Sequence, residues 1–190
     1  MKLHTNGLTG MTLAAVLSLA ATPLMAQTPA QPSTMSAPAK TDKAAGADTA
    51  FVMEAAKGGM MEVAKGKAAT QHASRDDVKQ FAQRMVDDHT KAGDELKSIA
   101  SGKNITLPPD QPSAKDQAML DKMSKMNGAA FDQAYIADQV KDHEKTIALF
   151  EKEARSGKDA ELKAFAEKTL PTLKEHLTAI RGLSSKKGTE

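Results

Sequence analysis

The stretch DDVKQFAQRMVDDHTKAGDELKSIA, residues 76–100, is the clearest amphipathic helix in the sequence. Its apolar residues recur at spacings of three and four, which places them on one face of a helix with 3.6 residues per turn. That face consists of Val78, Phe81, Ala82, Met85, His89, Ala92, Leu96 and Ile99. A histidine therefore shares the face that is predicted to turn toward the protein core.

The same periodicity predicts three further long helices, at residues 49–70, 129–154 and 159–183, and a short one at residues 114–126. Ser74 precedes two aspartates and is predicted to cap the helix that follows it. Residues 102–113 contain one glycine and three prolines, which predicts a non-helical connection. The predicted elements are thus two helical hairpins joined by a longer segment.

Four long helices in this order predict an all-α, ferritin-like four-helix bundle of two antiparallel hairpins, with the short extra helix in the crossover. An internal similarity favours this connectivity. Residues 76–84, DDVKQFAQR, follow the first hairpin turn, and the similar residues 160–168, AELKAFAEK, follow the second. The two hairpins therefore look like a duplication.

The ends of the chain are predicted to lie outside the bundle. Residues 1–26 have a positive start at Lys2, an apolar run of eleven residues and a small residue at Ala26, as in a secretory signal peptide. The apolar run is too short for a membrane span, which needs about 20 residues. Residues 27–48 are rich in Pro, Ala, Ser and Thr and predict a disordered linker. The bundle is then expected at residues 49–183 and a flexible tail at residues 184–190.

These segments predict a periplasmic or secreted protein with no transmembrane segment after signal cleavage. The chain has no cysteine, which excludes disulfides and thiolate metal sites. Without Lys2, 25 of the 26 Lys and Arg residues remain against 24 Asp and Glu, and both signs are interspersed along the helices. Nucleic-acid-binding proteins normally carry a basic surface, so no nucleic acid is expected as a partner, whereas an envelope protein partner stays open.

Four polar residues share the predicted core-facing stripes: Glu62, His89, His143 and His176. A crossover makes helices 76–100 and 129–154 parallel, and His89 and His143 then lie at nearly the same height. Side chains that face one another at one level in a bundle core predict a metal site, and this donor set suits Zn, Cu or Fe.

An acid precedes each of the three histidines: Asp88, Asp142 and Glu175. Adjacent residues point about 100° apart on a helix, so each acid is expected to accept a hydrogen bond from an imidazole of a neighbouring helix. The same residues also allow a histidine–acid network without metal, in a structural or interaction module. A third interpretation is a metal-dependent redox enzyme whose open coordination position binds oxygen or a peroxide. No nucleophile elbow, phosphate loop or dinucleotide fingerprint is present, and no catalytic residue is assigned.

Four runs carry a resemblance to a known family: FVMEAAKGGMMEVAKGKAA, VKQFAQRMVDDH, GAAFDQAYIADQVKDHEKTIALFEKEA and LPTLKEHL. They resemble the bacterial domain-of-unknown-function 4142 family over nearly all of residues 49–183. The resemblance implies a secreted, ferritin-like protein and no established activity. The matching positions are Glu62, Asp88, His89, Phe131, Asp132, Tyr135, His143, Pro171 and His176.

The chain departs from classical ferritin-like di-iron proteins, which carry Glu-x-x-His on two helices. Here the residues three positions before the histidines are Val86, Val140 and Leu173. A carboxylate-bridged di-iron centre is therefore not expected, and ferroxidase chemistry does not follow from the fold.

Overall fold

The computed structural model describes residues 40–186, and over that range it contains five α-helices and no strand. The helices are α1 (Lys40–His72), α2 (Asp76–Gly102), α3 (Ala114–Ser124), α4 (Gly128–Ser156) and α5 (Ala160–Ser185). The predicted all-α class is confirmed. The predicted signal peptide, linker residues 27–39 and tail residues 187–190 lie outside the described residues.

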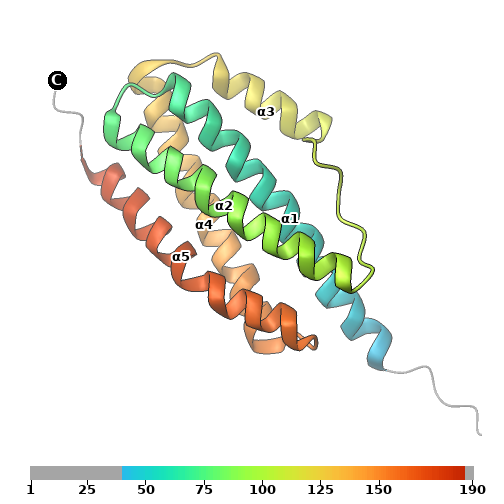
Figure 1. Ribbon diagram of the computed structural model, residues 1–190. Helices are drawn as coiled ribbons and strands as arrows, with labels where there is room; N and C mark the ends of the chain where they lie inside the picture. The colour runs from blue at the N-terminus through green and yellow to red at the C-terminus, as the bar shows by residue number, and fades with distance from the viewer. Residues whose placement is uncertain (1–39, 187–190) are drawn as a thin grey trace, which may run out of the picture. The chain divides into compact units, whose positions relative to one another are not determined.

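Helices α1, α2, α4 and α5 form a four-helix bundle, and α3 packs against α1 and α4 at its edge (Figure 1). The pairs Arg84–Glu175 and Glu95–Lys168 show that α2 and α5 are antiparallel. Because α1–α2 and α4–α5 are each antiparallel hairpins, α2 is parallel to α4. The chain between α2 and α3 runs back along the bundle, so the connection is a crossover, as predicted (Figure 1).

The apolar core consists of two clusters, one toward each end of the bundle. One is built around Phe81, Phe131 and Tyr135 near the α1–α2 turn. The other is built around Phe150 and Phe165 near the α4–α5 turn. On each of the four long helices, one or two buried polar residues lie between these clusters in sequence, so the core has a polar layer at mid-height. This layer contains Glu62, Lys65, His89, Gln139, His143 and His176.

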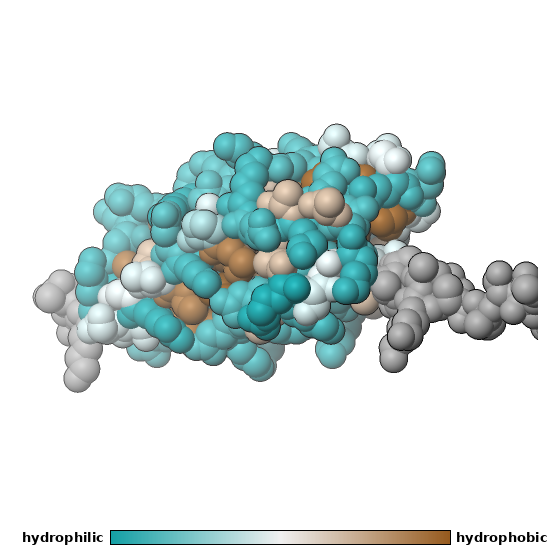
Figure 2. All heavy atoms as spheres, turned by 90° about the horizontal axis from the view of Figure 1, so that it is seen from below, coloured by the Kyte–Doolittle hydropathy of each residue, from teal (hydrophilic) through white to brown (hydrophobic). Residues whose placement is uncertain are grey.

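The outer surface is mostly hydrophilic. Figure 2 shows one face on which hydrophilic residues surround smaller hydrophobic areas. Met119 of α3 is the one large hydrophobic residue exposed in the described part of the chain. None of the helices described there combines the length and the apolar character needed to cross a membrane.

Helix α1 begins at Lys40, nine residues before its predicted start, so residues 40–48 of the predicted disordered linker are helical. Asp48 supplies a physical reason, because its buried carboxylate accepts backbone hydrogen bonds from Lys158 at 3.1 Å and Asp159 at 2.7 Å. The start of α1 is thereby tied to the α4–α5 turn. The alanines of this stretch favour a helix, whereas its lack of large apolar residues favours disorder. The prediction followed the second signal.

Ser74 does not cap α2, contrary to the prediction, because Arg75 occupies the N-cap position without a side-chain cap. The Ser74 hydroxyl instead donates to Asp132 of α4 at 2.6 Å. The Asp132 carboxylate also accepts the backbone N–H groups of Ser74 and Arg75, at 3.0 and 3.1 Å. A carboxylate from another helix therefore closes the α1–α2 turn.

The two hairpin turns are closed in the same way, each by an aspartate from the opposite hairpin. Asp132 lies 84 residues after Asp48, and Lys158 lies 84 residues after Ser74. The similar runs that begin at residues 76 and 160 have the same offset. This shared register agrees with a duplicated hairpin.

Candidate metal centre

The polar layer brings the three predicted histidines together from three helices. His89 comes from α2, His143 from α4 and His176 from α5, and all three are buried. One ring nitrogen of each lies within 4.8 Å of the other two. Three nitrogens bound to one tetrahedral ion at about 2.1 Å would be about 3.4 Å apart, so the rings need to approach by no more than about 1.5 Å.

Hydrogen bonds set the tautomer of two of these rings. The Nδ1 of His143 lies 2.9 Å from the carbonyl oxygen of Gln139, which can only accept, so Nδ1 carries the proton. The Nε2 of His176 lies 2.8 Å from a carboxylate oxygen of Asp88, so in this ring Nε2 carries the proton. The remaining nitrogens, Nε2 of His143 and Nδ1 of His176, therefore have a free lone pair. This is the arrangement by which outer partners orient metal-bound imidazoles.

The free nitrogens have no hydrogen-bond partner among the described residues. They are Nε2 of His89, Nε2 of His143 and Nδ1 of His176, and all three atoms are buried. Burying a polar atom without a partner costs about 1–3 kcal/mol, so three such atoms in one place need an explanation.

The electrostatic environment keeps these rings neutral near pH 7. Burial, together with the neighbouring His143 and His176, lowers the pKa of His89 to about 3. Burial lowers the pKa of His143 to about 4. Burial also lowers the pKa of His176, although its hydrogen bond to Asp88 opposes this effect. A neutral imidazole is the form that binds a metal, so protons compete little for these sites at neutral pH.

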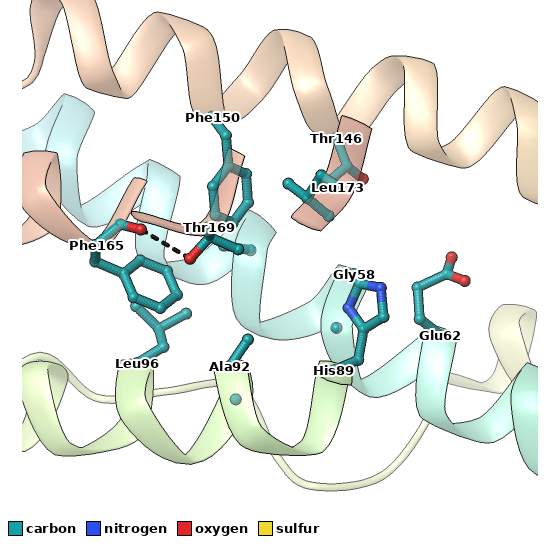
Figure 3. Close-up of a pocket in the computed structure, with 13 residues that line it drawn as sticks. Gly58, Glu62, His89, Ala92, Leu96, Thr146, Phe150, Phe165, Thr169 and Leu173 are labelled. Carbon is teal, nitrogen blue, oxygen red and sulfur yellow. Dashed lines mark hydrogen bonds between the residues drawn. The ribbon is translucent and has the colours of Figure 1, made fainter. Parts of the chain in front are cut away.

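Glu62 is buried in the same layer but does not belong to the group of mutually close ligand atoms. Its carboxylate accepts a hydrogen bond from Gln139 at 2.5 Å and lies 3.7 Å from the Lys65 ammonium. Burial raises the pKa of Glu62 to about 7, against the opposing effects of Lys65 and Gln139. Figure 3 shows the carboxylate on one side of the His89 ring.

Of the three acids predicted to hold imidazoles, only Asp88 contacts one among the described residues. Asp142 pairs with Lys65 and Glu175 pairs with Arg84. Arg84 also pairs with Asp88, so the His176 partner is itself held in place. Asp142 and Glu175 therefore contact basic side chains and do not hold an imidazole.

Sequence reasoning missed two buried residues of the layer, Lys65 and Gln139. The Lys65 ammonium pairs with Asp138 at 2.6 Å and with Asp142, both on α4. Burial lowers the pKa of Lys65, but the three surrounding acids outweigh burial and raise it overall. The available signal was spacing, because Lys65 follows Glu62 by three residues and Gln139 precedes His143 by four, on the same helix faces.

Comparison with protein families identifies a match. The family model described as Domain of unknown function (DUF4142) matches residues 33–183. The chain belongs to this family. No curated protein and no solved structure matches the chain. The description of the DUF4142 family names no activity, so the chemistry of this domain rests on the residues of its polar layer.

Proposed function

We propose that this domain is an envelope protein that binds one transition-metal ion through His89, His143 and His176. The observation that carries the proposal is the convergence of three buried, neutral imidazoles, each with a nitrogen that has no partner among the described residues. Three imidazole donors suit Zn, Cu or Fe, with Cu(II) bound most tightly among divalent ions. The role that fits is metal buffering or stress protection, after export directed by residues 1–26.

The alternative of a histidine–acid network without metal explains fewer of the contacts. Asp88 and Gln139 each satisfy one nitrogen of a ring, and the second nitrogen of that ring gains nothing from them. Such a core would carry an uncompensated cost of about 1–3 kcal/mol for each nitrogen. A bound ion removes this cost at all three rings together.

The test is elemental analysis of the mature domain, exported to the periplasm and purified without a histidine tag or chelator. We expect about one metal ion per chain in the natural protein and none in His89→Ala or His176→Ala. His72→Ala is the matched control, because His72 lies outside the cluster and should keep the metal. Circular dichroism of each variant shows whether it is folded.

Metal binding should also stabilise the fold, because an ion that binds only the folded state adds to the free energy of unfolding. At a free metal concentration of about 100 times the Kd the gain is about 2.7 kcal/mol. A natural protein that stays metal-free after incubation with Zn, Cu and Fe, and whose melting temperature does not change in chelator, would overturn the proposal.

A further inference from the structure

A small cavity lies next to His89, between α1, α2, α4 and α5. Its volume is about 30 Å³, and most of its wall is apolar. Ala55, Leu96, Phe150, Phe165 and Leu173 form much of this wall. Figure 3 shows the His89 ring and Glu62 toward one end of the cavity and the phenylalanines and Leu96 toward the other. A polar atom without a partner, Nε2 of His89, thus belongs to a residue that borders an apolar space.

Gly58 of α1 contributes to this space by having no side chain. It lies between Ala55 and Glu62 on the buried side of the helix, and Figure 3 places it beside His89. A Cβ atom at Gly58 would have no neighbour within 4 Å. Gly66, two turns later, differs, because a Cβ there would lie 2.8 Å from Val86. One glycine lets α1 and α2 pack closely, and the other leaves room beside the histidine.

The size and the lining of the cavity limit what it can hold. A cavity of this volume has room for one or two water-sized groups. Its apolar wall disfavours a charged ligand, because burying an unpaired charge is costly. A ligand of two or three non-hydrogen atoms without net charge meets both limits.

A second opening near His89 has a different character. A cleft of about 130 Å³ between α2 and α5 is lined by His89 and His176 together with the charged residues Asp88, Glu95 and Lys168. Charged side chains along the wall suit the passage of a metal ion. The apolar cavity on the α1 side is therefore available for a different, uncharged species.

We propose that the apolar cavity admits a small uncharged ligand, of the class of dioxygen, hydrogen peroxide and nitric oxide, to an open coordination position of the ion. This inference rests on the metal centre proposed above. Three protein nitrogens leave at least one position free on a four-coordinate ion, as in catalytic metal sites. Glu62 also lines the cavity and lies at the same end as His89 (Figure 3).

The test uses nitric oxide as the probe and the Fe(II)-loaded mature domain under anaerobic conditions. Iron content is measured first, and the iron–nitrosyl signal is then followed by electron paramagnetic resonance during a titration. We expect about one signal per bound iron in the natural protein. Gly58→Val, which fills the cavity, should weaken nitric oxide binding at least tenfold at unchanged iron content, and Gly58→Ala should weaken it less.

Gly182→Val is the matched control, because Gly182 lies inside α5, also has open space around its Cα and does not line the cavity. It should bind nitric oxide as the natural protein does. Equal affinity in Gly58→Val, or no signal from a natural protein that holds iron, would overturn the role of the cavity and leave the metal centre standing. A natural protein that takes up no iron, zinc or copper would overturn the metal centre itself.

Discussion

Replacing Lys65 by methionine tests whether the buried ion-pair network holds α1 to α4. The Lys65 side chain is 2 % exposed, and its ammonium faces the carboxylates of Glu62, Asp138 and Asp142. Methionine has a similar length and is apolar, so the change removes the positive charge with little change in packing. The three acids then remain around an uncharged group.

The expected cost follows from how each acid can respond. Removing one partner of a buried ion pair typically costs 3–5 kcal/mol. Asp138 and Asp142, with side chains 26 % and 34 % exposed, can regain water, and Glu62 can take up a proton because its pKa is already raised to about 7. Because the acids can respond in these ways, we expect a cost at the lower end of this range, about 3 kcal/mol. For a domain of this size the melting temperature should fall by about 6–12 °C.

Glu62→Gln provides the contrast, since it removes a charge that burial disfavours and leaves Lys65 with two acids. We expect it to change the free energy of unfolding by less than about 1 kcal/mol. The double variant should recover at least half of the loss caused by Lys65→Met, because the buried carboxylate is then absent. Thermal melts followed by circular dichroism at pH 7 in chelator measure all three. The reasoning fails if Lys65→Met costs less than about 1 kcal/mol, or if the two single changes simply add.

Two further predictions concern the carboxylates near the hairpin turns. Asp132→Ala removes the acceptor of three hydrogen bonds and should lower the free energy of unfolding, measured in urea, by about 2–4 kcal/mol. The control is Asp94→Ala, on the exposed side of α2, which should change this free energy by less than about 0.5 kcal/mol. Equal effects of the two changes would contradict the role of Asp132. Burial, together with Asp48 and Asp159, raises the pKa of Glu153 to about 7. The folded state therefore holds the proton of the Glu153 carboxyl group more tightly than the unfolded state does. The free energy of unfolding should decrease as the pH rises from about 4.5 to about 7. Glu153→Gln should therefore raise the free energy of unfolding by about 1 kcal/mol at pH 8, after allowance for screening by solvent, and by less at pH 5. If the free energies of unfolding of the natural protein and the variant depend on pH in the same way, this prediction is wrong.

The helices and the three histidines were predictable because one physical rule governs both. A stripe with a 3.6-residue period identifies a buried helix face, and a histidine on that stripe is buried with it. The crossover then made α2 parallel to α4 and put His89 and His143 at the same level.

Residues whose position depends on a partner from another helix were not predictable in the same way. A lysine is rarely buried, so the sequence predicts a solvent-facing Lys65, and its burial depends on Glu62 and on the two acids of α4. Ser74 has the local pattern of an N-cap, yet Asp132 binds both its hydroxyl and its backbone N–H. In both cases a tertiary contact outweighs the local preference, and one sequence does not reveal which acid will make it.

The exchange of aspartates between the hairpins has a consequence for how this domain folds. Asp48 closes the α4–α5 turn and Asp132 closes the α1–α2 turn, so neither hairpin contains the groups that complete its own loop. The histidine cluster is divided in the same manner, with one ring from the first hairpin and two from the second. Each half is therefore a poor folding unit alone, and the domain should unfold in a single cooperative transition. Two fragments produced by cleavage within residues 103–113 should gain helical structure only when they are mixed. A metal ion that binds all three histidines should stabilise the complex of the two fragments.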